Sequence, residues 1–249
     1  MDDLNPPQWL VRADGVRLAF HYRAGKGPTL VFLPGYMSDM EGSKAIALEA
    51  WAIRESRAML RLDYSGCGKS GGAFEDGTLD IWRDDVLLMI HHLIEGPVLL
   101  VGSSMGGWLA LLITLVLKSQ VVGLIGIAGA PDFTDWGFGD REKEQLQAHG
   151  RLERVSEYGP EPMVTTRAFW ESGNANRLLQ SEIAIDCPVR LIHGQRDSDV
   201  PWQISLDLAA RLRSADVQTL LIKDGDHRLS RPPDIAALLR VVGESLEAL

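Results

Sequence analysis

The sequence predicts an α/β fold: a mostly parallel central sheet flanked by helices, with a small helical cap. Short apolar runs bounded by glycine or proline alternate regularly with helical patterns along the chain, which is typical of a parallel sheet covered on both faces. The 249 residues, 45% of them hydrophobic, are enough for one large core. We therefore expect a single domain over residues 1–249, interrupted by a cap insertion at residues 132–183.

The strands are expected where apolar runs end at turn residues. The first of them alternates apolar and polar residues with period two, which indicates an antiparallel strand, and the others are typical of buried central strands. In chain order the expected strands are residues 16–24, 28–35, 57–64, 97–104, 121–129, 187–194 and 217–225.

Helical patterns fill the intervals between these strands. Pro201 and Pro232 are expected in the first turns of the last two helices, where a missing N–H costs nothing. The expected helices are residues 43–55, 78–95, 105–118, 201–213 and 232–249.

One segment, residues 132–183, breaks the alternation and has no strand-like run. It is long for a connection and rich in aromatic residues, so we expect a small helical cap over the sheet. Its aromatic side chains could line an acyl pocket, with Trp108 and Trp202 as weaker candidates. The aromatic residues of the segment are Trp136, Phe138, Tyr158, Phe169 and Trp170.

Charge, cysteine content and hydropathy exclude several classes of partner. A net charge of -9 argues against nucleic acid. Two cysteines and an N-terminus without signal-peptide features predict a cytoplasmic protein. Residues 96–117 are uncharged, but the glycines at their centre favour a buried strand, turn and helix, so we expect no stable membrane insertion.

A serine lies between an apolar strand and an apolar helix, in the pattern G-x-S-x-G over residues 102–106. Such a turn needs small residues two positions before and after the serine, and only Ser104 is flanked in this way, because Ser103 would need a glycine at Val101. The turn also offers the backbone N–H of Met105 to a developing oxyanion. Ser104 is therefore the predicted nucleophile.

His227 is the predicted base among the six histidines. It follows the last strand, at the sheet edge where the serine emerges and where open α/β sheets place their sites. His91 and His92 are adjacent on a helix and do not share a site. His193 ends a strand and is expected to be packed and hydrogen-bonded.

An acid that orients the base is expected in the sequence HGQRDSDVPW. Asp197 and Asp199 are both candidates there, and spacing does not choose between them. Asp226 is expected to be a turn residue, because adjacent side chains rarely make such a bond. The chain order serine, aspartate, histidine is that of one class of hydrolase.

The glycine spacing in LRLDYSGCGKSGGAF, residues 60–74, partly matches two nucleotide-binding motifs, the P-loop and the dinucleotide fingerprint. A P-loop would need a glycine at Asp63, and a dinucleotide fingerprint would need Gly66, Gly68 and Gly71 to open a helix, whereas the chain is predicted to be irregular until about residue 78. Cys67 has no predicted partner that would activate its thiol. We expect a supporting loop near the site.

These motifs together resemble the α/β-hydrolase family over essentially the whole chain. The resemblance rests on Pro34-Gly35-Tyr36, the serine motif, His193-Gly194-x-x-Asp197 and Gly225-Asp226-His227. It implies that Asp197 is the acid and that the N–H of Tyr36 is the second oxyanion donor. It also implies an acyl-enzyme mechanism that needs no metal or organic cofactor.

A narrower resemblance is to mitochondrial members of this family that act as palmitoyl-protein thioesterases and acyl-glucuronide esterases. It implies an acyl ester or acylated protein as substrate, and we expect this chain to differ from those members in lacking a transit peptide. Two alternatives stay open: a peptidase or perhydrolase with the same three residues, and a non-catalytic ligand-binding member. Serine at the turn excludes a dehalogenase, which needs aspartate there.

Overall fold

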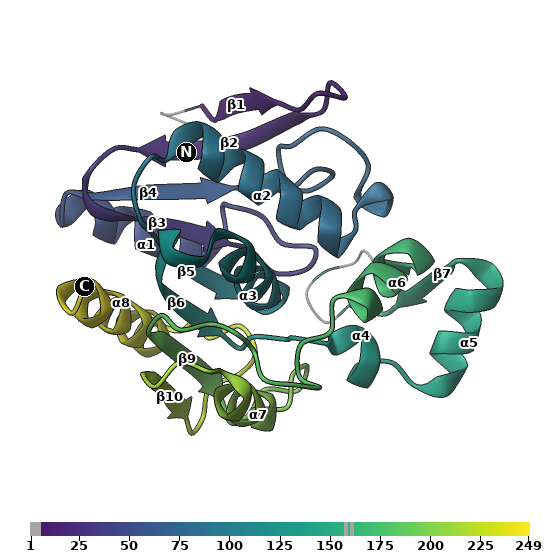
Figure 1. The fold of residues 1–249 in the computed structure, drawn as a ribbon. Coiled ribbons are helices and arrows are strands. Elements are labelled where there is room, and N and C mark those ends of the chain that lie inside the picture. The colour runs from purple at the N-terminus through teal and green to yellow at the C-terminus, as the bar shows by residue number, and fades with distance from the viewer. Residues whose placement is uncertain (1–5, 157–158, 160–161) are drawn as a thin grey trace.

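The computed structural model describes residues 6–156, 159 and 162–249 of the chain (Figure 1). Eight of the strands in these residues form one sheet, in the order β1-β2-β4-β3-β5-β6-β9-β10. The strands are β1 (Gln8–Val11), β2 (Arg17–Arg23), β3 (Lys26–Leu33), β4 (Arg57–Leu62), β5 (Val98–Ser103), β6 (Val121–Ile127), β9 (Val189–Gly194) and β10 (Val217–Ile222).

The pairing within the sheet is parallel from β4 to β10 and antiparallel at the other edge. β2 runs antiparallel to both β1 and β4, which confirms the direction predicted for the first strand. The sequence prediction missed β1, which has only four residues and is largely exposed. All six residues of β5 are buried, as expected for a central strand.

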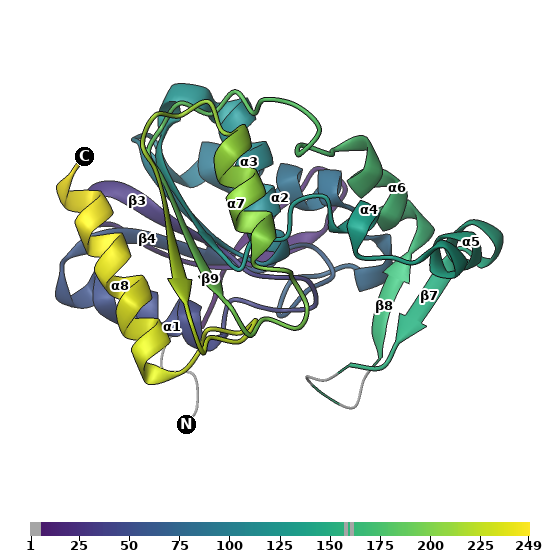
Figure 2. The same cartoon turned by 90° about the horizontal axis from the view of Figure 1, so that it is seen from below.

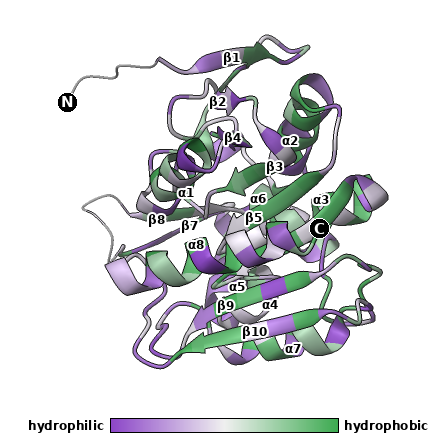
Figure 3. Ribbon diagram, turned by 90° about the vertical axis from the view of Figure 1, so that its left-hand side faces the viewer, coloured by the Kyte–Doolittle hydropathy of each residue, from purple (hydrophilic) through white to green (hydrophobic). Residues whose placement is uncertain are grey.

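Two layers of helices cover the sheet (Figure 2). One layer holds α1 and α8, and the other holds α2, α3 and α7, so the central strands are buried on both faces and carry hydrophobic residues (Figure 3). The five helices are α1 (Ser43–Arg54), α2 (Leu79–Leu93), α3 (Met105–Leu117), α7 (Gln203–Arg211) and α8 (Pro232–Glu247); single 3-10 turns are η1 (Phe74–Asp76) and η2 (Lys118–Gln120).

Two expectations about the helices have different outcomes. Pro232 does open α8, but Pro201 lies before the N-cap residue Trp202 and therefore outside the first turn of α7. The uncharged stretch 96–117 folds as β5, a turn and α3. Within the described ranges, no helix has both the length and the apolar character needed to cross a membrane.

The segment after β6 lies to one side of the sheet (Figure 1). It contains helices, as expected, but also a two-stranded antiparallel sheet, which corrects the prediction that it has no strand. Its elements are α4 (Phe133–Trp136), α5 (Asp140–His149), β7 (Arg151–Arg154), β8 (Met163–Thr166) and α6 (Arg167–Ala175). Tyr158, an expected cap aromatic, lies outside the described residues. We refer to Phe133–Ala175 as the cap.

The two ends of the cap meet at one buried carboxylate. Asp132, in the left-handed conformation with φ of 59°, accepts hydrogen bonds from the backbone N–H groups of Leu178 and Leu179, both at 2.8 Å. The chain thus leaves the sheet after β6 and, after the cap, comes back to the same anchor at Leu178 and Leu179 before it continues to β9.

Parallel pairing brings the carboxyl ends of four strands to one edge of the sheet. The loops that follow β3, β5, β9 and β10 therefore lie near one another. These are the loops that carry Tyr36, Ser104, Asp197 and His227.

Candidate active site

Ser104 occupies the turn between β5 and α3 in a strained backbone conformation. Its φ is 54° and its ψ is -120°, a region that non-glycine residues rarely adopt. Its backbone is held by the neighbouring strand: its N–H donates to the Ile127 carbonyl, and its carbonyl accepts from the Ala130 N–H. The strain is thus supported by the fold, and the side chain is presented at the sheet edge.

Two glycines make this turn possible. A Cβ at Gly102 would overlap the Gly106 backbone and lie 2.6 Å from the Gly107 nitrogen. A Cβ at Gly106 would overlap the Leu33 carbonyl and lie 2.6 Å from the Pro34 carbonyl oxygen. The two glycines of the pattern G-x-S-x-G are therefore required by two close backbone contacts, one within the turn and one between α3 and the end of β3.

The loop after β3 lies directly against the serine. A Cβ at Gly35 would lie 3.3 Å from the Ser104 Cβ. Tyr36 follows this glycine, and Met105 is the first residue of α3. The two backbone N–H groups predicted as oxyanion donors thus belong to residues adjacent in sequence to Gly35 and Ser104.

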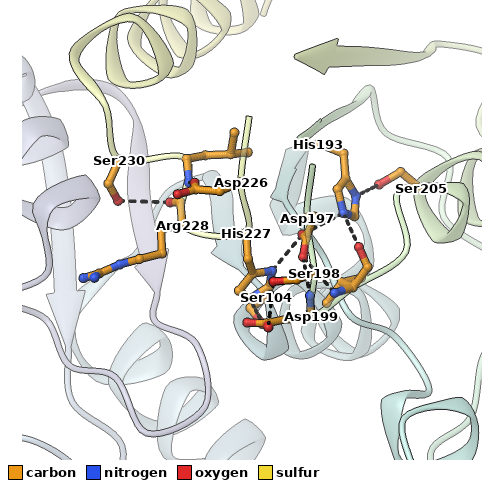
Figure 4. A network of polar contacts seen from close by, with 12 residues as sticks. Ser104, His193, Asp197, Ser198, Asp199, Ser205, Asp226, His227, Arg228 and Ser230 are labelled. Carbon is orange, nitrogen blue, oxygen red and sulfur yellow. Dashed lines mark hydrogen bonds and ion pairs between the residues drawn. The ribbon is translucent and has the colours of Figure 1, made fainter. Parts of the chain in front are cut away.

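His227 and Asp197 reach Ser104 from the loops after β10 and β9 (Figure 4). His227 Nε2 lies 3.1 Å from Ser104 Oγ, and His227 Nδ1 lies 2.8 Å from Asp197 Oδ2. Because Nδ1 faces a carboxylate, it carries the proton, and this N–H donates a hydrogen bond to Asp197. Nε2 is then free to accept a hydrogen bond from the serine hydroxyl. The structure brings together these three predicted residues in a continuous chain of hydrogen bonds.

The carboxylate of Asp197 is fully buried, whereas 15% of the His227 side chain is exposed. Burial alone would raise the pKa of Asp197, but hydrogen bonds from His193 and His227 outweigh it and hold that pKa well below its ordinary value. Asp197 is therefore ionised and available to stabilise a positive charge on His227.

The alternative acids lie elsewhere in these loops. Asp199 is exposed, and its backbone N–H donates to Asp197 Oδ1 at 2.9 Å. Asp226 accepts a hydrogen bond from the Leu229 N–H at 2.9 Å, as expected for a turn residue. Only Asp197 among the three bonds to His227 in the described part of the chain.

Tyr36 is the centre of an aromatic cluster that sequence reasoning did not identify. Its ring packs between the cap and α2, with centroid distances from 4.7 to 6.0 Å, and its hydroxyl donates to the Val164 carbonyl of β8 at 2.6 Å. Trp108, a weaker candidate for an acyl pocket, is buried and contacts Phe133 of the same cluster. The rings around Tyr36 are Phe74, Trp82, Phe133 and Phe169.

The glycine-rich loop after β4 supports the loop that carries Tyr36. The buried Asp63 carboxylate accepts from the Met40 N–H at 2.7 Å and the Lys69 N–H at 2.8 Å, which joins the two loops. The next α-helix begins at Leu79, well after the glycines, so they do not open a helix as a dinucleotide fingerprint requires. Burial raises the pKa of Cys67 to about 12, which makes its thiol a poor nucleophile at neutral pH.

Within residues 6–156, 159 and 162–249, no group of three or more histidine, cysteine, aspartate or glutamate side chains is arranged to hold a metal ion.

The strand order, the serine turn and its hydrogen-bonded histidine are those of a hydrolase built on an α/β sheet. A family model described as the alpha/beta hydrolase family matches residues 30–242. The chain belongs to the α/β-hydrolase family, which confirms both the predicted fold class and the predicted resemblance.

The particular relatives narrow this class. The chain is 38% identical over 245 residues to the human mitochondrial palmitoyl-protein thioesterase ABHD10, and the match covers 97% of this chain and 80% of that protein. The solved mouse alpha/beta hydrolase domain-containing protein 10 has a TM-score of 0.92 at 37% identity and covers 98% of this chain and 99% of that one. A hydrolase from Agrobacterium vitis has a TM-score of 0.91 at 41% identity, with 97% and 100% covered. These relatives identify the chain as an enzyme, a hydrolase.

The predicted cytoplasmic location is wrong by the same comparison. The human and mouse relatives that match 97% of the chain are named as mitochondrial proteins. Composition could not have distinguished the two locations, because two unpaired cysteines fit any reducing compartment.

Proposed function

We propose that the protein is a serine hydrolase that cleaves acyl esters or acyl thioesters through an acyl-enzyme. Ser104 is the nucleophile, His227 the general base and then acid, and Asp197 the acid that orients His227. The observation that carries this proposal is the continuous chain of hydrogen bonds at 3.1 and 2.8 Å from the strained Ser104 to the buried Asp197.

The first half of the reaction forms the acyl-enzyme. Ser104 Oγ attacks the acyl carbonyl carbon while its proton passes to His227 Nε2, and the buried charge of Asp197 stabilises the imidazolium. The tetrahedral oxyanion accepts hydrogen bonds from the N–H groups of Met105 and Tyr36. His227 then gives the proton to the leaving alcohol or thiol as its bond to the acyl carbon breaks.

The second half releases the acid. Water attacks the acyl-enzyme carbonyl and transfers a proton to His227, the same two N–H groups stabilise the second oxyanion, and His227 returns the proton to Ser104 Oγ. This cycle consumes one water and needs no cofactor.

The substrate class proposed is an acyl group carried by a protein thiol or by a small activated ester. The names of the ABHD10 relatives support a palmitoyl thioester on a protein, and the narrower sequence resemblance adds acyl glucuronides. The rings around Tyr36 come from the cap, α2 and η1, and apolar surroundings of this kind suit an acyl chain better than a charged group.

The test uses adjacent serines as a matched pair. We expect Ser104→Ala to abolish labelling by a fluorophosphonate probe and hydrolysis of a p-nitrophenyl ester, and Ser103→Ala to retain both. Labelling or turnover that survives in Ser104→Ala would overturn the nucleophile assignment. Hydrolysis of the ester without hydrolysis of a matched palmitoyl thioester would reject the thioesterase part alone.

A further inference from the structure

A second histidine, His193, contacts the same carboxylate oxygen as His227. It lies in β9, one residue before the end of the strand, and its side chain is fully buried. Its Nε2 lies 3.0 Å from Asp197 Oδ2 and 3.1 Å from the Val200 carbonyl oxygen, and its Nδ1 lies 2.7 Å from Ser205 Oγ in α7 (Figure 4). Sequence analysis predicted a packed, hydrogen-bonded side chain here but not this partner.

The surroundings of His193 determine where its proton lies. Nε2 faces two acceptors, the Asp197 carboxylate and the Val200 carbonyl, so Nε2 carries the proton and this N–H donates hydrogen bonds to them. A neutral ring then has a lone pair at Nδ1, which the hydroxyl of Ser205 satisfies by donating to it. Ser205 is itself buried, so this bond fixes the orientation of the ring.

Asp197 is thereby held at both oxygens. Its Oδ1 accepts from the backbone N–H groups of Asp199 and Val200, at 2.9 and 2.8 Å. Its Oδ2 is shared between His193 at 3.0 Å and His227 at 2.8 Å. The N–H dipole of His193 points its positive end at the oxygen that faces His227, and so it opposes part of the attraction that Asp197 exerts on a protonated His227.

We propose that His193 is a positioning residue for the proposed catalytic site. Its ring is fixed by the hydrogen bond with Ser205, and its N–H orients Asp197 toward His227. The same N–H weakens the stabilisation that Asp197 gives to the protonated form of His227. This inference rests on the proposed function, because it assigns His227 the role of base. This role accounts for a fully buried histidine whose N–H donates to a carboxylate that already accepts hydrogen bonds from three other donors.

Within the described residues, the side chains bonded to His193 carry no buried charge other than that of Asp197. On the sheet side its register partner in β10 is Leu221, and α7 presents Ser205 to it. Asp226 and Arg228 flank His227, and in Figure 4 the Arg228 side chain is directed away from the imidazole. Apart from Asp197, the charged side chains of α7 and of residues 195–202 and 223–230 are all exposed: Arg196, Asp199, Asp207, Arg211, Lys223, Asp224, Asp226 and Arg228.

The test compares variants that remove or retain the donor at position 193. His193→Leu removes it, and we expect the acid limb of kcat/KM against pH to move to higher pH by roughly 0.5 to 1 unit. The shift has this sign because Asp197 then holds the His227 proton more strongly. Ser205→Ala unlocks the ring and is expected to give a smaller shift in the same direction. His193→Gln retains an N–H near the position of Nε2 and should keep the wild-type profile.

A merely structural role would change stability and leave the profile in place. His91→Gln, at an exposed position on α2, is the control and should change neither. A His193→Leu profile that coincides with wild type, or a His193→Gln profile shifted as far as that of His193→Leu, would overturn the proposal. If His193→Leu does not fold, a Ser205→Ala profile identical to wild type has the same meaning.

A second measurement does not depend on turnover. The nitrogen-15 chemical shifts of the His227 imidazole, followed against pH, give the midpoint at which its proton is lost. We expect this midpoint to rise in His193→Leu, and an unchanged midpoint would overturn the proposal. The proposed function fails separately, if the wild-type protein neither reacts with the fluorophosphonate nor hydrolyses the ester.

Discussion

Gly106→Ala is expected to damage catalysis through one backbone contact. The added Cβ would overlap the Leu33 carbonyl and lie 2.6 Å from the Pro34 carbonyl oxygen, whereas ordinary contact begins near 3.4 Å. The start of α3 and the end of β3 must therefore separate by about 0.8 Å or more, the difference between these two distances. Met105 and Tyr36 lie on opposite sides of this gap, one on α3 and the other on the loop after β3.

The cost has two parts that different assays measure. Overpacking between two backbones costs about 1 to 3 kcal/mol of the free energy of unfolding. For a chain of this size, that loss lowers Tm by roughly 2 to 4 °C per kcal/mol. Separating the two proposed oxyanion donors is equivalent to losing one of them, which lowers kcat by about 100-fold or more.

The assay is kcat for a p-nitrophenyl ester, measured well below the Tm of the variant so that the enzyme is folded. Gly243→Ala in α8 is the matched control, because its Cβ would meet Trp51 at an ordinary 3.8 Å. It should raise stability by up to about 1 kcal/mol, since alanine favours a helix, and leave kcat unchanged. A Gly106→Ala enzyme with wild-type kcat would refute the argument that this contact sets the spacing of the oxyanion donors.

Two further predictions concern the cap and the buried acid. Tyr36→Phe removes the hydrogen bond to the Val164 carbonyl and should lower the free energy of unfolding by about 1 kcal/mol. We expect faster amide hydrogen exchange in residues 163–166 with little change in kcat, and unchanged exchange would contradict this prediction. Because the pKa of Asp197 is held below its ordinary value, the stability that its carboxylate contributes is present above the ordinary carboxyl pKa near 4 and is lost as pH falls toward the folded-state value. The difference in free energy of unfolding between wild type and Asp197→Asn, measured by urea titration, should therefore shrink as the pH is lowered from 6 toward 3, and a difference independent of pH would count against this account.

The parts of the fold that could be predicted from sequence are those whose signal is local. β5 is apolar and entirely buried, and the glycines beside Ser104 are required by contacts within one short turn and its neighbour. β7 and β8 were missed because they have four residues each and pair only with one another in the described chain, away from the main core. Strands that bury little apolar surface leave a weak pattern.

Sequence motifs predicted the residue types of the candidate site, but spacing alone did not choose between close alternatives. Asp197 and Asp199 are two residues apart, and the structure separates them through a backbone turn that directs one carboxylate inward and leaves the other exposed. The contact of His193 with Asp197 depends on a ring orientation fixed from α7, and the rings around Tyr36 come from distant segments. Such contacts arise from tertiary packing and have no spacing rule.

The hydrogen bonds of Asp132 bear on how the cap could change over evolutionary time. The Asp132 carboxylate bonds to backbone N–H groups 46 and 47 positions further along the chain, so the intervening segment starts and ends at a single anchor. Insertions, deletions or wholesale exchange of the 45 residues between Asp132 and Leu178 would then leave the ends of β6 and β9 where they are. Residues 133–177, which include the cap, are thus a unit that could be exchanged between relatives while the sheet keeps its arrangement.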